Sequence, residues 1–201
     1  MTNTIIKTYT SPPIDRAEIF RYLRAEPTEA LLDTVECAIG ETEDKLTYKV
    51  CYRYFDISGS DGEIDLGFAT CRSHSLIRHL DGCDGIILFA ATVGAELDRM
   101  IRRCALVSAA KALVLHAIGN ERIESLCDEF CKDIKNEMIN AGRRVKKRFS
   151  PGYGDLPLEL QECVFRALSP ESAIGLSLSE ALLMSPTKSV TAIIGIEEAD
   201  K

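Results

Sequence analysis

The segment from Ala95 to about Asn140 constrains the fold most strongly, because its apolar residues follow a helical pattern over most of that length. One interruption of this pattern is expected between Ala105 and Ser108. Small residues are frequent after the interruption: Ala109, Ala110, Ala112, Ala117 and Gly119. Small side chains let other elements approach a helix closely. We therefore predict a central helix against which the rest of the chain packs.

The other segments mix helical and strand patterns. In chain order they predict helices over residues 14–24 and 28–40, a strand over 46–57 that turns back into 64–68, a short helix over 73–80 and a buried strand over 85–92. Beyond the central helix they predict a basic strand before residue 148, a helix over 157–168 with Pro157 in its first turn, and strands over 173–179 and 190–196. No repeat, low-complexity tract or linker divides the chain, so residues 1–201 are predicted to form one α+β domain.

The acidic balance of the chain limits its partners. The formal net charge is −7, and the one basic cluster, Arg143 to Arg148, stands among 31 acidic residues. A broad basic surface for nucleic acid is therefore not expected. No apolar run approaches the roughly 20 residues of a membrane span. The first residues also lack the pattern of an export signal, so we predict a cytoplasmic protein with no membrane contact.

Eight cysteines and three histidines raise the question of a metal or redox site. The cysteines are scattered, lie mostly inside apolar segments, and include no CxxC pair or other zinc-ligand spacing. Free and mostly buried thiols are therefore expected. Cys127 and Cys131 lie four positions apart and share a helix face. They could hold a metal or form a redox pair, but two core cysteines are the favoured interpretation.

Other short motifs add little. His116 to Gly119 matches part of the Asp-x-His-x-x-Gly signature by which many corrinoid proteins bind cobalt, but Val114 occupies the aspartate position. The segment also lies inside the predicted helix, so no metal ligand is predicted there. Gly-x-Ser-x-Gly, Walker and GxGxxG motifs are missing from the sequence. The sequence therefore gives no support for a hydrolase or for a protein that binds nucleotide phosphates or dinucleotides.

The stretch RFSPGYGD, from Arg148 to Asp155, contains two glycines and a proline, so neither a helix nor a strand can continue through it. Taken alone, it is most simply a turn. Its arginine and its aromatic ring, however, are residue types that hold an anionic or planar ligand. The neighbouring motifs decide between a turn and a binding loop.

This loop resembles the Arg-x-x-Pro-Gly-Tyr signature of the reactivation domain of cobalamin-dependent methionine synthase, which binds S-adenosylmethionine. The resemblance extends to Leu178–Ala192, similar to a Met-x-Pro-x-x-Ser-Val-Ser-Gly stretch, and to residues 122–130, similar to a helix that supplies a ligand-binding glutamate. It covers about the C-terminal half of the chain. Residues 154–157 depart from it, with Gly-Asp-Leu-Pro in place of a Pro-Ala-Cys-Pro-like segment.

The resemblance implies a single α+β domain with a twisted antiparallel sheet and a long central helix. It also implies how S-adenosylmethionine is held. Arg148 would bind the carboxylate with both arms of its guanidinium, and Glu124 would balance the ammonium or bind the ribose. The main chain of Ser150 and the ring of Tyr153 would complete a cradle, and Gly152 would let the backbone approach the ligand. No catalytic residue and no metal ligand are expected.

The function implied is that of a stand-alone reactivation partner of a cobalamin-dependent methionine synthase. Cobalamin would be present only on the partner chain, and a flavodoxin-like or ferredoxin-like protein would donate the electron. Two alternatives remain: a binding or assembly protein of corrinoid metabolism that has lost methyl-donor binding, and a redox or metal-binding protein built on Cys127 and Cys131.

Overall fold

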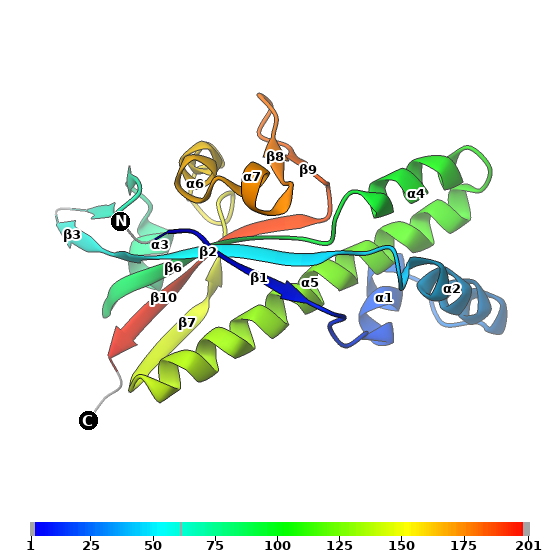
Figure 1. Ribbon diagram of the computed structural model, residues 1–201, viewed down its shortest axis with the longest axis horizontal. Coiled ribbons are helices and arrows are strands. Elements are labelled where there is room, and N and C mark those ends of the chain that lie inside the picture. The colour runs from blue at the N-terminus through cyan, green and yellow to red at the C-terminus, as the bar shows by residue number, and fades with distance from the viewer. Residues whose placement is uncertain (1–2, 61, 199–201) are drawn as a thin grey trace.

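The computed structural model describes residues 3–60 and 62–198, which fold around a five-stranded sheet (Figure 1). The strand order is β1-β2-β6-β10-β7, and every neighbouring pair is antiparallel. The strands are β1 (Ile5–Tyr9), β2 (Tyr48–Asp56), β6 (Cys83–Thr92), β7 (Arg143–Phe149) and β10 (Ser189–Glu198). Together with a long helix described below, this sheet confirms the predicted α+β fold.

The central strand β6 is buried on both faces, from Gly85 to Thr92. Because successive side chains of a strand point to opposite faces, it contributes to two separate cores. Phe89 belongs to the core on one face, and Leu88 belongs to the core on the other. A run of apolar residues without alternation therefore marks a strand covered by helices on both sides.

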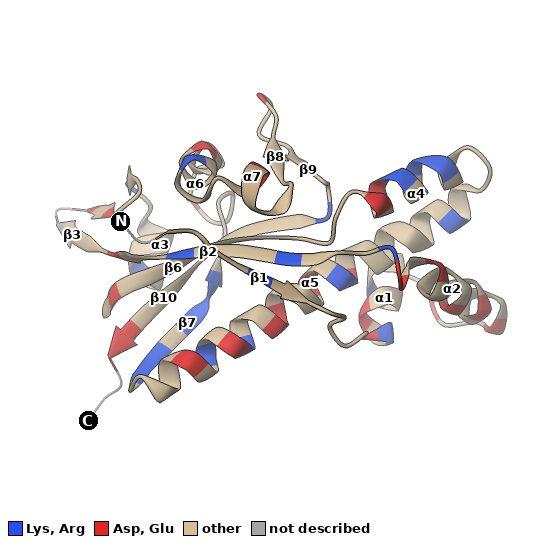
Figure 2. Ribbon diagram, in the orientation of Figure 1, with Lys and Arg blue, Asp and Glu red and all other residues tan. Residues whose placement is uncertain are grey.

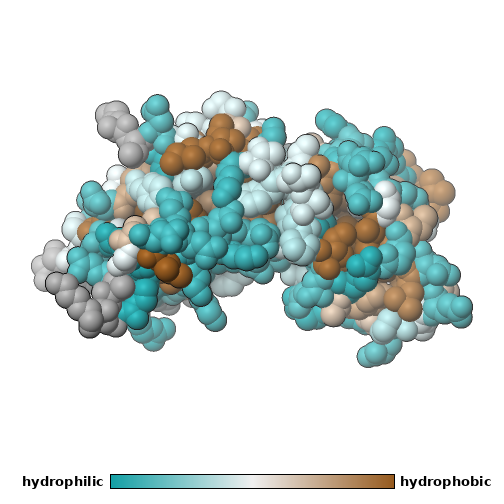
Figure 3. Space-filling view, turned by 60° about the horizontal axis from the view of Figure 1, so that its bottom comes forward, coloured by the Kyte–Doolittle hydropathy of each residue, from teal (hydrophilic) through white to brown (hydrophobic). Residues whose placement is uncertain are grey.

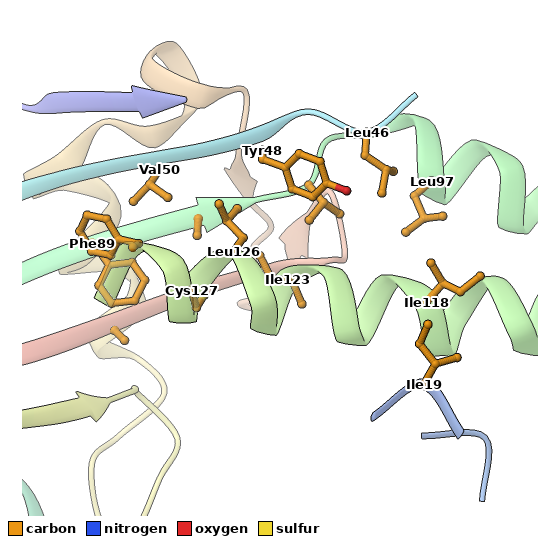
Figure 4. Close-up of a cluster of buried hydrophobic side chains, with 14 of the residues drawn as sticks. Ile19, Leu46, Tyr48, Val50, Phe89, Leu97, Ile118, Ile123, Leu126 and Cys127 are labelled. Carbon is orange, nitrogen blue, oxygen red and sulfur yellow. The ribbon is translucent and has the colours of Figure 1, made fainter. Parts of the chain in front are cut away.

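Helices α1 (Arg16–Leu23), α2 (Glu29–Thr42), α4 (Glu96–Ala105) and α5 (Ala109–Asn140) build the larger core. Figure 4 shows Phe89 of the sheet beside Leu126 and Cys127 of α5. The rings of Phe89 and Phe130 lie 4.8 Å apart between centroids. Helix α5 continues past the sheet, where α1, α2 and α4 pack around it (Figure 1).

The predicted close packing on the central helix occurs at Gly119. A Cβ atom added there would lie 2.5 Å from Leu97 Cδ2 of α4 and 3.0 Å from carbons of the Lys188 side chain. The predicted interruption is also present, because α4 ends at Ala105 and α5 begins at Ala109. Ser108 caps α5, since its side chain accepts a hydrogen bond from the Lys111 N–H.

Shorter elements cover the opposite face of the sheet and extend its end. The helices are α3 (His74–His79), α6 (Leu160–Leu168) and α7 (Pro170–Ile174). The strands are β3 (Ser58–Ser60), β4 (Glu63–Asp65) and β5 (Thr70–Cys71) in one small sheet, and β8 (Ser177–Leu178) and β9 (Met184–Ser185) in another. Among the helices of residues 3–60 and 62–198, none is long and apolar enough to cross a membrane.

Four local predictions need correction. Helix α2 continues through Gly40 to Thr42, because a mid-helix glycine on the exposed side disturbs no packing. Helix α6 begins at Leu160, and Pro157 lies in the turn before it. Residues 173–179 are not one strand, since they hold the end of α7 and the two-residue strand β8. The predicted pairing between the strand over 46–57 and residues 64–68 is also different: β4 pairs with β3, whereas β2 pairs with β1 and β6.

The basic strand β7 is compensated by carboxylates within the chain. Arg143 pairs with Asp84, and Lys146 lies 3.5 Å from Glu197. Figure 2 shows the basic residues of β7 next to the acidic residues that recur along α5. The face turned forward in Figure 3 is mainly hydrophilic, with separate hydrophobic patches. The positive charges of residues 143–148 are therefore partly neutralised by neighbouring carboxylates and do not form a broad basic surface.

Candidate functional site

The candidate site lies where β7 stops pairing with β10. The last residue of β7, Phe149, pairs with Ile193, whereas β10 already begins at Ser189. The first residues of β10 therefore extend past the end of β7 along that edge. The chain leaves β7 at this point and enters the loop that the sequence singles out, so the loop and the uncovered strand edge face the same space.

A pocket of about 650 Å³ occupies this space. Its lining comes from α5, the loop, the start of α6, the β8–β9 connection and β10: Glu124, Arg148, Phe149, Ser150, Pro151, Tyr153, Leu158, Gln161, Leu182, Leu183, Met184, Thr187, Ser189, Val190 and Thr191. Four of the five residues predicted to bind a ligand line it: Glu124, Arg148, Ser150 and Tyr153. The structure thus brings Glu124 of α5 together with the loop.

Arg148 is the central charged group of the pocket. Its Nη2 atom donates to Glu124 Oε2 at 2.5 Å and lies 3.3 Å from Asp128 Oδ1. Burial lowers the pKa of the guanidinium, but the neighbouring acidic groups raise this pKa by more than burial lowers it. The net shift is therefore upward. Two carboxylates beside one guanidinium leave one negative charge in excess, which favours a ligand that carries positive charge.

Gly152 is the predicted site residue that does not line the pocket. Its φ is +90°, and its N–H donates to the Leu156 carbonyl at 2.9 Å. An added Cβ would lie 3.5 Å from Leu158 Cδ1, an ordinary van der Waals contact. The positive φ of the turn therefore accounts for a glycine at this position.

The end of the loop is anchored on α3. One oxygen of Asp155 accepts from Ser73 Oγ at 2.6 Å and from the Ser75 N–H at 3.0 Å, and the other accepts from the His74 N–H at 2.8 Å. The Ser73 hydrogen bond, followed by those from the backbone, lowers the pKa of the Asp155 carboxyl well below its usual range. This carboxylate caps the start of α3 from the loop and so positions the loop.

Gly154 lets the loop approach α3. Its φ is +58°, and an added Cβ would lie 2.7 Å from Ser75 Oγ and 2.9 Å from Ser75 Cβ. On the other side of the loop, His79 Nε2 lies 2.7 Å from the Lys147 carbonyl oxygen. Helix α3 therefore supports both ends of the loop. Nothing in the local sequence predicts that support.

The opposite wall, formed by residues 182–191, contains none of the predicted site residues. Leu182 has a positive φ of 59°, and Leu183 is 68% exposed at the rim. Thr187 is held from α4, because Asp98 accepts from its N–H at 2.8 Å and from its hydroxyl at 2.6 Å. The sequence signal for this wall is the resemblance over residues 178–192.

The cysteine and histidine candidates lie apart from the pocket lining. Cys127 is buried and Cys131 half-buried. Burial raises the pKa of the Cys127 thiol far above its usual range and that of Cys131 to about 11. Thiols with such pKa values are poor nucleophiles and poor metal ligands. In the part of the chain that the structure describes, no three His, Cys, Asp or Glu side chains come together as a possible metal site.

Comparisons with known proteins bear on the fold. No family model matches the sequence, and no curated protein matches it. Among solved structures, the chain is similar to the crystal structure of the MetH reactivation domain bound to AdoHcy, with a TM-score of 0.74 and 15% sequence identity. The alignment covers 99% of this chain and 80% of that chain. At this level of identity, the similarity establishes a shared fold.

Proposed function

We propose that this chain binds S-adenosylmethionine in the pocket beside Arg148 and presents its methyl group to a corrinoid held by a partner chain. In this role it is a stand-alone reactivation partner of a cobalamin-dependent methionine synthase. The structural neighbour is a reactivation domain with AdoHcy bound, which supports a related ligand for this fold.

The observation that carries the proposal is the joint position of Arg148 and Glu124 in one pocket. They come from different elements, lie 2.5 Å apart, and line a space of about 650 Å³ that also has apolar walls. Volumes of this order hold ligands the size of a nucleoside with an amino-acid tail. The charged end and the apolar remainder match the two parts of S-adenosylmethionine.

The chemistry of the ligand fits the charges. Its amino-acid end carries a carboxylate and an ammonium, and its sulfonium adds one further positive charge. Arg148 can bind the carboxylate through guanidinium nitrogens not used by Glu124. Glu124 and Asp128 supply the negative charge that favours a cationic ligand over a neutral one. The role of these residues is to bind and orient, and no side chain of the pocket has to act as a nucleophile.

Presentation to a partner requires an accessible ligand. Tyr153 and Leu183 at the pocket rim are each 68% exposed, so the rim is open to a second protein. The partner's cobalt would supply the nucleophile for the methyl group, after reduction by a flavodoxin-like or ferredoxin-like donor. This chain would contribute proximity and orientation.

Isothermal titration calorimetry with S-adenosylmethionine tests the proposal. Arg148→Ala should weaken binding by about tenfold to a hundredfold, because a charge-assisted hydrogen bond contributes on the order of 1.5–3 kcal/mol. Lys146→Ala is the matched control. Its side chain is on the same strand but contacts Glu197 and the Asp81 carbonyl, outside the pocket.

Two results would count against the proposal: wild-type protein that binds no more tightly than millimolar, or Arg148→Ala and Lys146→Ala variants that bind alike. Either result would favour a binding or assembly protein of corrinoid metabolism without methyl-donor binding. A redox or metal-binding protein would instead be indicated by stoichiometric metal in protein purified without chelators.

A further inference from the structure

Gln161 is an amide side chain buried in the wall of the pocket. It is only 4% exposed, yet it lines the pocket from the first turn of α6. Its Oε1 atom accepts a hydrogen bond from Thr191 Oγ1 of β10 at 2.9 Å. Thr191 is 2% exposed and also lines the pocket. The two polar groups thus form a buried, hydrogen-bonded pair in the pocket wall.

Among residues 3–60 and 62–198, the Nε2 atom of Gln161 makes no hydrogen bond, and it is not one of the buried side-chain atoms left without a partner. The atom is therefore open to the space of the pocket. An amide nitrogen has two hydrogens to donate, and both are available there to a ligand. A donor kept in a pocket wall, on a residue already held by a second hydrogen bond, is what a site for a polar ligand atom requires.

The pair lies on the other face of the sheet from Arg148. Ile193 belongs to the core under α6, whereas Ile194, the partner of Arg148 in the sheet, belongs to the core under α5. Thr191 has the same parity as Ile193, so its side chain points to the α6 side. The pocket wraps around the uncovered strand edge, with the charged end on one side and the amide on the other.

We propose that Gln161, held by Thr191, recognises the base of the ligand and selects a 6-aminopurine. This inference rests on the proposed function and adds the group that reads the base. Nε2 would donate to a ring nitrogen of adenine. The 6-amino group would donate to Oε1, which has a second lone pair, or to the Thr191 hydroxyl. A glutamine amide matches this donor–acceptor edge with two hydrogen bonds.

Hypoxanthine, the deaminated base, is the informative competitor. It has nearly the same size, but it replaces the 6-amino group by a carbonyl and carries a hydrogen on N1. With the amide in the orientation in which Oε1 accepts from Thr191, the carbonyl oxygen would then face Gln161 Oε1, acceptor against acceptor. Sites that pair buried polar groups with a ligand discriminate strongly against analogues that leave those groups unpaired. A pocket that selected its ligand by size alone would bind the adenine and hypoxanthine compounds about equally well.

The test compares binding of S-adenosylhomocysteine and S-inosylhomocysteine by calorimetry. Wild type should prefer the adenine compound by at least about tenfold. Gln161→Leu should weaken the adenine compound and bring the ratio of the two dissociation constants close to one. Arg148→Ala should weaken both compounds and leave the ratio unchanged, because it acts on the end they share. Glu162→Leu is the control for introducing a leucine into this helix, because Glu162 is exposed and lies next to Gln161 in α6.

If the Gln161→Leu variant does not fold, Gln161→Glu provides a second test. The carboxylate keeps the size of the side chain and can still accept from Thr191, but it cannot donate to a ring nitrogen. At pH 8 the preference for adenine should therefore be lost.

Equal wild-type affinities, a preference for inosine, or an unchanged ratio in Gln161→Leu or Gln161→Glu would overturn this inference and leave methyl-donor binding intact. Wild type that binds neither compound nor S-adenosylmethionine would overturn both proposals.

Discussion

Arg148 Nη2 lies 2.5 Å from Glu124 Oε2, although one residue lies next to the end of an edge strand and the other in the middle of the long helix. The arginine is thus already oriented by an ion pair within the chain. The side chain of Arg148 is 24% exposed and that of Glu124 42% exposed. A ligand carboxylate would share the guanidinium with Glu124 rather than replace it, because the remaining nitrogens can still donate.

Removing the charge of Glu124 should act on the charge of the ligand. Glu124→Gln leaves Arg148 and Asp128 with no net charge between them. We expect S-adenosylmethionine to bind about threefold to tenfold more weakly, since partly exposed charge pairs contribute up to about 1 kcal/mol. S-adenosylhomocysteine lacks the sulfonium charge and should lose less. Titration of both compounds at low and moderate salt measures this, and equal losses would contradict the charge argument.

The two glycines of the loop should differ in their effect on stability. Gly152→Ala imposes a positive φ on alanine but creates no clash, so the free energy of unfolding should fall by about 1–2 kcal/mol. Gly154→Ala adds a contact of 2.7 Å with Ser75 Oγ and should cost more. Urea denaturation of both variants checks the order. Gly142→Ala is a control for positive φ alone, since an added Cβ meets nothing within 4 Å there.

Asp155→Asn should destabilise the protein in a pH-dependent way. The pKa of this carboxyl is lowered in the folded state, so its contribution is complete above the unfolded value of about 3.9 and is lost as the pH falls toward the folded value. The difference in unfolding free energy between wild type and variant should therefore be constant from pH 7 to 5 and shrink below pH 4. Urea titrations across this range measure it.

Asp44→Asn is the comparison for Asp155→Asn. Asp44 is exposed, and within the described ranges its side chain makes no hydrogen bond. Its substitution removes one carboxylate without removing a hydrogen bond and should change the free energy of unfolding at pH 7 little. A difference for Asp155→Asn that stays constant down to pH 3 would show that the carboxylate does not stabilise α3 through its charge.

Thiol reactivity should follow burial. Cys37 is the exposed cysteine of the eight, whereas burial raises the pKa of the Cys51 thiol to about 12. Titration with a thiol reagent should find one fast group in the native protein, absent from Cys37→Ser, and eight groups after denaturation without reductant. Fewer than eight would reveal disulfides.

Local sequence patterns predicted helices, strands and the loop, whereas the resemblance predicted which residues contact a ligand. The helical period, its interruption before Ala109 and the strand over residues 46–57 depend on neighbours in the chain, and the structure has each of them. The loop at Arg148 was found in the same way, from residue types that end regular structure. Gly152 has a positive φ but does not line the pocket, so its contact with a ligand stays a prediction, because a sequence does not show which side of a turn faces a pocket.

The sequence by itself determined most of the longer helices and strands, the interruption of the long helix and the position of the loop, because helix period, capping and turn preferences act over a few residues. Tertiary structure alone decided that Asp155 would cap α3, that Asp98 would hold Thr187, and that Gln161 would meet Thr191. These partners are separated by 82, 89 and 30 positions. They meet only because strands and helices distant in the chain pack around one sheet, which no local pattern encodes.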